Sequence, residues 1–517
     1  MPRSYLYLLV VTAGFTTLGV ELSASRLLDP WFGNSLIVWA SLIGLILLYL
    51  TVGYWLGGRV ADRWPHPLVL LRLTGAAAVG VGLIPAISRP VLRLASLGLD
   101  TFDAGVLAGS MGAILVLFAV PVTLLGCVSP YAVRLAIRDV RGSGEVAGRI
   151  SALSTAGSIA GSFLPVLWLI PSIGTRRTFA VLSLALLVVV ILGLLVQRRR
   201  VDVLALVAAA AVVAWLGWRP AGPLKDAQGL VYETESAFNY IQVLDLGVER
   251  QLRLNEGEGI HSVYRPAGGL ADGIWDYFLL APAFNPAPYE PDRVQRVAIV
   301  GLAAGTMAQL FTEGYGPIAI EGAELDPAIL RTGREWFDMN QPNLAAYAMD
   351  GRRFLYRPPD GAAASYDVIA VDAYRPPYIP FHLITAEFFA LARDRLADTG
   401  VVAVNVGRTH TDYSLVDAVA ATMRQVFPSV FVVDEPDNGS PLGNSLVVAT
   451  RQPATLDDLR ANLPAFGDGL LGQVAPVMSG ARVAAPPAGA PIFTDDRAPV
   501  EQVVHKLVLR HVLGPVE

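Results

Sequence analysis

The sequence predicts a multi-pass α-helical membrane domain followed by an α/β domain, with a small β-sheet at the start of the second part. Three observations lead to this prediction. Hydrophobic residues make up 53% of the 517 residues, and most of the long apolar runs lie before residue 219. From about residue 226 the composition becomes that of an ordinary globular domain. Within that second part, short β-rich runs alternate with segments of helical periodicity.

Several apolar runs in the first part are long enough to cross a bilayer, which takes about 20 residues of helix. We expect spans near residues 5–27, 35–57, 68–87, 106–128, 151–170 and 178–196. A weaker run at 203–218 leaves six or seven spans open. Its roughly 16 residues would form a helix of about 24 Å, and Trp215 and Trp218 at its end would suit a position in the membrane interface.

The placement of arginine predicts the orientation. The loops at 58–67, 129–150 and 197–202 contain nine arginines, whereas the alternate loops contain five. Cytoplasmic loops carry the excess of basic residues, so the N-terminus is expected inside. Six spans would then leave the C-terminal domain in the cytoplasm, and seven would place it outside. We expect a multi-pass protein of the cell membrane with a cytoplasmic C-terminal domain.

The expected domains are a transmembrane helical domain at 1–220, a small β-sheet subdomain at 221–290 and a Rossmann-like domain at 291–517. Residues 230–265 alternate apolar and polar side chains, which is typical of antiparallel strands. Strands and helices then alternate as far as residue 450. Such alternation implies a mostly parallel sheet that is covered by helices on both faces. Ligands of such sheets bind outside the carboxyl ends of the strands.

Charge, cysteine and histidine content exclude several classes of function. The net charge of −5 argues against a nucleic-acid partner. The single cysteine, Cys127, lies in an apolar run and cannot form an intrachain disulfide. His261, His382 and His410 do not show the spacing of metal ligands, so no metal site is predicted.

Polar features fall at the ends of four predicted strands. The turn from Gly301 to Gly305 follows the first strand, and its small side chains let a ligand approach the backbone. Glu324 ends the second strand, where a carboxylate can accept both hydroxyls of a ribose. Asp350-Gly351 follows the third strand and can accept from an adenine amino group. Asp372 ends the fourth. Together they predict a site for an adenosine-containing ligand, with NAD as an alternative although the turn lacks G-x-G-x-x-G.

These residues carry a resemblance to the spermidine synthase (polyamine aminopropyltransferase) family, and the whole chain resembles the membrane-fused branch of that family. The match runs from about 230 to 450. It extends to 21-ELSASRLLDPWFGNS-35, 148-GRISALSTAGSIAG-161 and 493-FTDDRAPVE-501. The resemblance implies an enzyme that transfers an aminopropyl group from decarboxylated S-adenosylmethionine to an amine and releases methylthioadenosine. The amine would be putrescine, giving spermidine, or a related acceptor.

The resemblance also implies partners and roles. No cofactor would be bound permanently, because decarboxylated S-adenosylmethionine is a co-substrate. The partners would be the amine, the nucleoside and the lipid bilayer, and a homodimer stays open. Asp372 would accept the proton of the attacking amine. The residues expected to bind the nucleoside are Asn239 (where the family has a glutamine), Gly301, Gly305, Glu324, Asp350, Gly351 and Pro380.

The acceptor side departs from the family pattern. Two aspartates that the family places near the amine fall on Ala304 and Arg375. A diamine is cationic and favours carboxylates around it, so the acceptor cannot be inferred from the soluble enzymes. The family's tyrosine-histidine pair aligns loosely with 275-WDY-277. The acceptor-side candidates are Asp276, Tyr277, Tyr374 and Arg375.

Two further interpretations stay open. The same fold could belong to a methyltransferase that uses S-adenosylmethionine, in which case Arg375 would meet a carboxylate. Alternatively, the chain could be a catalytically inactive family member whose membrane half carries out transport or binds a partner. The acids of 494-TDDR-497 either line the site or pair with nearby arginines.

Overall fold

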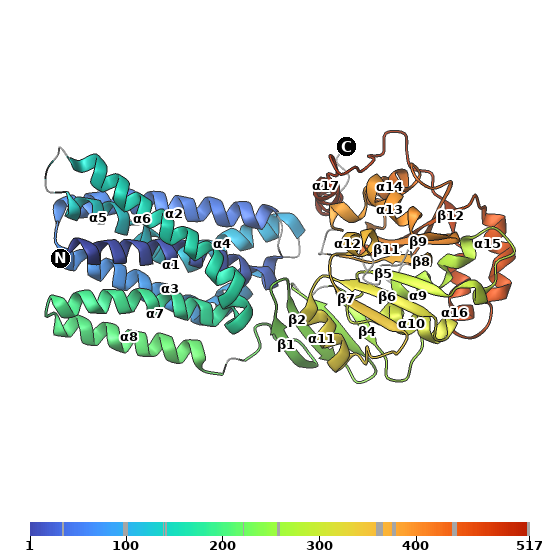
Figure 1. Cartoon of the computed structure of the whole chain (residues 1–517), viewed down its shortest axis with the longest axis horizontal. Helices are drawn as coiled ribbons and strands as arrows, with labels where there is room; N and C mark the ends of the chain where they lie inside the picture. Colours follow the sequence, from blue (N-terminus) through green and yellow to red (C-terminus); the bar gives the residue numbers. More distant parts are fainter. Residues whose placement is uncertain are drawn as a thin grey trace. The chain divides into compact units, whose positions relative to one another are not determined.

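The chain was examined as a computed structural model that describes residues 1–33, 36–96, 102–137, 139, 142–220, 222–255, 259–357, 365–374, 379–436 and 442–513. It forms two compact units (Figure 1). The helical unit comprises Met1–Asp226 and Thr234–Tyr240, and the α/β unit comprises Ala227–Glu233 and Ile241–Glu517. The predicted boundaries at 220 and 290 stay predictions.

The helical unit is built from long apolar helices. They are α1 (Arg3–Phe32), α2 (Leu36–Arg63), α3 (Pro67–Ser96), α4 (Phe102–Gly126), α5 (Val128–Ala136), α6 (Ser143–Leu164), a π-helical turn (Pro165–Leu169), α7 (Ile170–Val196) and α8 (Arg200–Trp218). Helix α6 packs closely on α1, because a Cβ on Gly157 or Gly161 would overlap backbone carbonyls of α1. The small residues predicted for this segment therefore serve helix packing.

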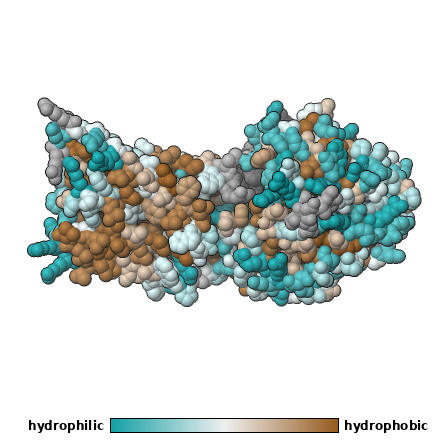
Figure 2. All heavy atoms as spheres, in the orientation of Figure 1, coloured by the Kyte–Doolittle hydropathy of each residue, from teal (hydrophilic) through white to brown (hydrophobic). Residues whose placement is uncertain are grey.

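Seven helices among the described residues are long and apolar enough to cross a membrane. The seventh, α8, has 19 residues, which is about 28 Å of helix at 1.5 Å per residue and longer than the run read from the sequence. It lies along α7 and α3, and Asp202 pairs with Arg72 of α3 at 3.0 Å. Hydrophobic side chains gather over the helical unit on the face that Figure 2 shows.

The helical unit also holds the short segment Thr234–Tyr240. Arg26, near the end of α1, donates to the carbonyl oxygen of Ser236 at 2.7 Å and forms an ion pair with Asp29 at 3.5 Å. Glu235 accepts a hydrogen bond from the backbone N–H of Thr175 at 2.9 Å. Charged and backbone groups therefore fasten this segment to α1 and α7.

The α/β unit contains a small antiparallel sheet and a large mixed sheet. The small sheet has the order β1-β2-β3-β4 and confirms the strands predicted at 230–265. Its strands are β1 (Leu230–Glu235), β2 (Tyr240–Asp245), β3 (Arg250–Leu254) and β4 (Ile260–Tyr264).

The large sheet has the order β12-β10-β11-β9-β8-β5-β6-β7, in which β11 runs antiparallel to both of its neighbours. Its strands are β5 (Arg296–Val300), β6 (Ala319–Glu324), β7 (Leu344–Ala348), β8 (Tyr366–Val371), β9 (Leu396–Thr409), β10 (Ser429–Asp434), β11 (Leu442–Thr450) and β12 (Arg482–Val483). This order is a methyltransferase-type Rossmann-like fold, as predicted. The carboxyl ends of β5 to β9 share one edge, where ligands of such sheets bind.

Helices cover both faces of the large sheet (Figure 1). They are α9 (Ile274–Tyr277), α10 (Thr306–Tyr315), α11 (Pro327–Trp336), α12 (Gly351–Tyr356), α13 (Ala386–Asp394), α14 (Ser414–Met423), α15 (Leu456–Asn462), α16 (Gly469–Met478) and α17 (Val500–Leu513), with 3₁₀ turns at Phe278–Phe284, Pro291–Arg293, Phe381–Leu383 and Leu463–Phe466. Phe311 and Phe284 belong to the apolar core on one face, and Phe388 and Val419 to the core on the other. The two cores hold the strand ends in fixed positions.

Candidate active site

The glycine turn after β5 brings two strand ends together. Gly301 and Gly305 have φ values of 92° and 94°, which only glycine adopts readily, and Ala303 between them has a φ of 48°. The backbone N–H groups of Gly301 and Leu302 both donate to the carbonyl oxygen of Ala323 in β6. A Cβ on Gly301 would overlap the backbone carbonyl of Asp372. The turn therefore lies directly against the end of β8.

Glu324 lies at the end of β6, as predicted. Its two carboxylate oxygens accept hydrogen bonds from the backbone N–H groups of Ala303, at 3.1 Å, and Asp326, at 2.9 Å. Burial raises the pKa of Glu324 to about 7, although these amides favour the charged form. A carboxylate fixed in this way under the glycine turn can accept the two hydroxyls of a ribose once it is ionised.

The pKa of Glu324 predicts that the affinity for the nucleoside expected from the sequence depends on pH. At pH 6 about a tenth of the free protein carries the ionised carboxylate, and at pH 8 about nine tenths. The affinity for methylthioadenosine should therefore rise about tenfold from pH 6 to pH 8. Calorimetric titration at both values measures it, and Glu324→Gln should remove the dependence. Equal affinities of the natural protein at the two pH values would contradict this role.

Asp350 caps the helix that follows β7. One carboxylate oxygen accepts the backbone N–H of Arg353 at 2.9 Å, and the other lies 2.8 Å from Nε2 of His382. The hydrogen bond with His382 lowers the pKa of Asp350. Next to it, a Cβ on Gly351 would overlap the side chain of Val300, which keeps this turn against β5. Asp350 is therefore an anchored carboxylate that keeps its charge.

One acid of the 494–497 segment pairs with an arginine. Asp495 contacts the Arg352 guanidinium through both carboxylate oxygens, at 2.7 and 2.6 Å. It also accepts a hydrogen bond from the hydroxyl of Thr385 at 2.8 Å. Of the two roles considered for this segment, lining the site or pairing with nearby arginines, Asp495 therefore has the pairing role.

Asp372 follows β8, and neutral donors hold both of its carboxylate oxygens. The indole N–H of Trp275 donates to Oδ2 and the side-chain amide of Asn405 donates to Oδ1, each at 2.8 Å. Burial raises the pKa of Asp372, and the two donors oppose that shift. A carboxylate oriented in this way, without a cationic partner among the described residues, can accept a proton from an amine.

Tyr374 extends the hydrogen-bonded network around Asp372. Its hydroxyl donates to the carbonyl oxygen of Asn405 at 3.2 Å and accepts from the backbone N–H of Gly407 at 2.6 Å. The network therefore runs from Asp372 along β9 towards β11. Oδ1 of Asn405 is buried and has no hydrogen-bond partner in the described part of the chain.

The two candidates of α9 differ in what they can offer a ligand. The Asp276 carboxylate accepts from the backbone N–H groups of Ala271, at 2.8 Å, and Gly273, at 3.2 Å, so it caps the first turn of α9. Burial raises the pKa of Tyr277 most, and the nearby negative charges of Glu435 and Asp276 raise it further. Tyr277 therefore stays a neutral phenol close to the Glu435 carboxylate.

The remaining predicted residues have different positions. Asn239 belongs to the helical unit, where its backbone N–H donates to the hydroxyl of Ser236 at 2.8 Å, and its role at the nucleoside stays a prediction. Pro380 immediately precedes the 3₁₀ turn Phe381–Leu383. Arg375 lies outside the described residues. Within the described ranges, no group of three or more His, Cys, Asp or Glu residues could hold a metal ion.

Sequence reasoning missed Trp275, Asn405 and His382 as contacts of the candidate site. Trp275 is 97 residues from Asp372 in the chain, so no local pattern could pair them. Asn405 did carry a signal, because it is an amide within the apolar run 401-VVAVNV-406 and lies one strand away from Asp372. His382 carried no signal, because it is a lone histidine without metal-ligand spacing, and its Nε2 lies 2.8 Å from the Asp350 carboxylate.

Comparisons with known proteins find sequence similarity to polyamine aminopropyltransferases. No protein-family model matches the chain. It is 34% identical over 199 residues to a probable polyamine aminopropyl transferase of Bifidobacterium longum (strain NCC 2705), which is 38% of this chain and 42% of the relative. It is 29% identical over 168 residues to a polyamine aminopropyltransferase of Vibrio vulnificus (strain CMCP6), which is 32% of this chain and 52% of the relative. The chain thus spans about half the length of these curated relatives, or less.

The comparison with solved structures also finds a match to the α/β part of the chain. The matched structure is a probable spermidine synthase from Corynebacterium glutamicum ATCC 13032, with a TM-score of 0.40 and 22% identity, and the match covers 52% of this chain and 97% of that chain. In sequence the chain is therefore similar to part of the polyamine aminopropyltransferases, and helices of membrane-spanning length precede its α/β unit.

Proposed function

We propose that the protein is a membrane-bound aminopropyltransferase that uses decarboxylated S-adenosylmethionine and an amine and releases methylthioadenosine. The observation that carries this proposal is the arrangement around Asp372. The carboxylate lies against the glycine turn, accepts two neutral donors and has a raised pKa. An acid in this state suits the acceptance of a proton from an amine close to neutral pH.

The reaction needs alignment and a proton acceptor. The amine nitrogen forms a bond to the aminopropyl carbon next to the sulfonium, and the C–S bond breaks with its electron pair moving to sulfur. Neutral methylthioadenosine leaves, and the proton from the amine moves to the Asp372 carboxylate. The sulfonium carbon is already electrophilic, so most of the rate enhancement comes from holding nucleophile and carbon in line.

The nucleoside would bind across the ends of β5, β6 and β7. Glu324 would accept hydrogen bonds from the ribose hydroxyls. The small residues of the Gly301–Gly305 turn would let the ligand approach the backbone of that turn. Asp350-Gly351 would face the adenine, with His382 fixing the carboxylate. Pro380 completes the proposed nucleoside contacts of the α/β unit, and the role of Asn239 stays a prediction from the sequence. The acceptor amine would lie beside Asp372, near Tyr374 and Tyr277.

Calorimetry with the purified full-length protein tests this assignment. Decarboxylated S-adenosylmethionine and methylthioadenosine should bind, and ordinary S-adenosylmethionine should bind more weakly. Stronger binding of ordinary S-adenosylmethionine would favour the methyltransferase alternative. If none of the three binds, the α/β unit is not a nucleoside enzyme.

We further propose that the α/β unit faces the cytoplasm of a cell-membrane protein, since nucleoside substrates of this kind are made there. The seven candidate spans among the described residues bear directly on this orientation, because their number is odd. An odd number of crossings puts the N-terminus and the α/β unit on opposite sides, and the arginine-rich loops favour an internal N-terminus. A cytoplasmic α/β unit therefore requires either an external N-terminus or an α8 that lies in the interface.

Reporter fusions after residues 200 and 225 decide between these arrangements. We expect the fusion after residue 225 to report the cytoplasm. Opposite signals from the two fusions would show that α8 crosses the membrane, and the same signal would place it in the interface. An external reporter after residue 225 would contradict cytoplasmic nucleoside chemistry.

A further inference from the structure

The acceptor side of the site lacks carboxylates where the family resemblance would place them. Ala304 is a buried alanine in the glycine turn. A diamine acceptor carries a second ammonium group, and a partly buried cation needs a negative partner. The carboxyl edge of the large sheet offers another acid for this role.

Glu435 lies at this edge, immediately after β10. Its backbone N–H donates to the carbonyl oxygen of Asn444 at 2.9 Å, so it continues the pairing of β10 with β11. In the sheet order, β11 and β9 lie between β10 and β8. Three strand spacings separate the backbones of Glu435 and Asp372 by roughly 14 Å. Two acidic side chains and a short diamine between them can span that separation.

Helix α9 links the two carboxylates. Trp275 donates to Asp372, and two residues further on Tyr277 lies within electrostatic reach of Glu435. A second route runs through the sheet, because Tyr374 bonds to Gly407, Gly407 pairs with Asn444, and Asn444 bonds to Glu435. Glu435 and Asp372 therefore border the same region at the carboxyl edge.

The charge of Glu435 is not neutralised by a basic side chain in the described part of the chain. Its Oε2 accepts from the backbone N–H of Asn444 at 3.3 Å and from the side-chain amide of Asn444 at 3.1 Å. The preceding residue, Asp434, behaves differently, because Arg482 lies 2.7 Å and Arg408 3.6 Å from its carboxylate. Adjacent residues of a strand point to opposite faces, which explains the separation of roles.

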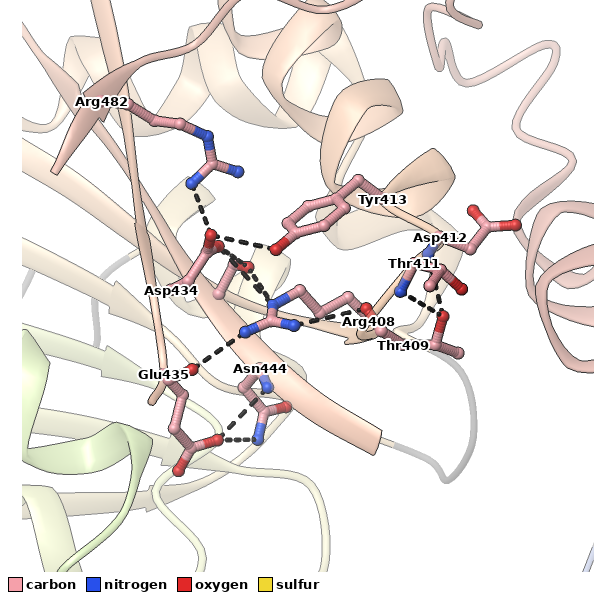
Figure 3. Close-up of polar contacts among 10 residues, drawn as sticks. Arg408, Thr409, Thr411, Asp412, Tyr413, Asp434, Glu435, Asn444 and Arg482 are labelled. Atoms are coloured by element: carbon pink, nitrogen blue, oxygen red, sulfur yellow. Dashed lines mark hydrogen bonds and ion pairs between the residues drawn. The ribbon is translucent and has the colours of Figure 1, made fainter. Parts of the chain in front are cut away.

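On the face of β10 that carries Asp434, hydrogen bonds hold the end of the strand in place. The buried Arg408 guanidinium donates to the hydroxyl of Ser445, at 3.1 Å, and to the backbone carbonyl of Glu435, at 2.9 Å. The hydroxyl of Ser445 donates in turn to Asp434 at 2.6 Å. Figure 3 shows this network and the Glu435 carboxylate turned away from Arg408 towards Asn444. The backbone of Glu435 is therefore held in place, and its carboxylate can pair with a cationic ligand.

We propose that Glu435 binds the distal ammonium group of a diamine acceptor while Asp372 takes the proton from its reacting amine. This inference rests on the proposed aminopropyl transfer and names its substrate class. It assigns specificity to the β10–β11 end of the site, which lies on the other side of β8 from the turn that contains Ala304. A monoamine of the same length would gain nothing from Glu435.

The test compares putrescine with n-butylamine, which has the same carbon chain and no second ammonium. In Glu435→Gln, kcat/KM for putrescine should fall about 10- to 100-fold, the range for loss of a charge-assisted hydrogen bond. The value for n-butylamine should change by less than about twofold. Glu435→Asp should recover part of the putrescine activity. Glu290→Gln makes the same chemical change at an exposed glutamate and should leave both amines unaffected.

Each outcome supports or overturns the inference. Equal losses for both amines in Glu435→Gln would mean that Glu435 supports the fold, and an unchanged value for putrescine would mean that the distal ammonium binds elsewhere. Either result overturns the role of Glu435 and leaves the transfer reaction standing. If the natural protein transfers aminopropyl groups to no amine, the proposed function itself fails, and this inference fails with it.

Discussion

Asp372→Asn is expected to lower kcat for aminopropyl transfer about 100- to 10,000-fold, which is the usual contribution of a general base. The substitution keeps the shape of the side chain and removes its capacity to take a proton. Trp275 can still donate to the amide oxygen, although one of the two present contacts will be lost. The expected loss is therefore in turnover, and the affinity for methylthioadenosine should stay close to that of the natural protein.

Single-turnover kinetics with saturating decarboxylated S-adenosylmethionine measures this effect without interference from product release. Asp398→Asn is the matched control, because the Asp398 side chain is 92% exposed and lies near the amino end of β9, away from the carboxyl edge of the sheet. Its kinetics should equal those of the natural protein. Retention of normal turnover by Asp372→Asn would show that another group accepts the proton.

Gly301→Ala should cost more than about 3 kcal/mol of folding free energy. An alanine at a φ of 92° is strained by about 1–2 kcal/mol. In addition, its Cβ would lie 2.6 Å from the carbonyl carbon of Asp372, so the ends of β5 and β8 would have to separate. Since the proposed proton acceptor is the carboxylate of that same residue, the variant should also lose transfer activity.

Gly316→Ala provides the matched control for strain alone. Gly316 has a φ of 81°, and nothing lies within 4 Å of a Cβ added there. With ψ at −164° this is a conformation that glycine adopts almost alone, so the cost of the substitution should be about 1–3 kcal/mol of backbone strain. Denaturant unfolding followed by circular dichroism compares the two variants. Similar costs would mean that β5 and β8 do not approach as closely as the structure shows.

The carboxyl-edge site could be predicted because its rule is local and geometric. Each strand of a parallel sheet is a short apolar run, and the residue after it lies at the ligand edge. Glu324, Asp350 and Asp372 all followed such runs, and the structure places each at the end of its strand. The nucleoside roles of Glu324 and Asp350 are predicted from these positions, the proton-accepting role of Asp372 comes from the family resemblance, and all of them stay proposals.

The contacts that set the orientation and the pKa of each acid could not be predicted. The partners of Asp372 come from α9 and β9, and those of Asp350 include His382 from a separate loop. These are tertiary contacts between distant parts of the chain, and periodicity carries no information about them. Similarly, the length of α8 depends on residues 200–202, which the hydrophobic pattern alone left out of the span.

The orientation of Glu435 could not be predicted from the sequence either. The segment 435-EPDNGSPLGN-444 has the composition of a loop, and loop composition does not reveal which way an acid points. Its pairing with Asn444, and the engagement of Asp434 by two arginines, become visible only when β10 and β11 are aligned. The proposed acceptor specificity therefore depends on how β10 and β11 are aligned, which composition does not predict.

The most direct test of the central claim is mass spectrometry of the products formed by the full-length protein with decarboxylated S-adenosylmethionine and a panel of mono-, di- and polyamines. We expect an amine product that has gained one aminopropyl group, with one methylthioadenosine released per transfer and a diamine as the best acceptor. A methylated product formed from S-adenosylmethionine instead, or no transfer to any amine, would contradict the account.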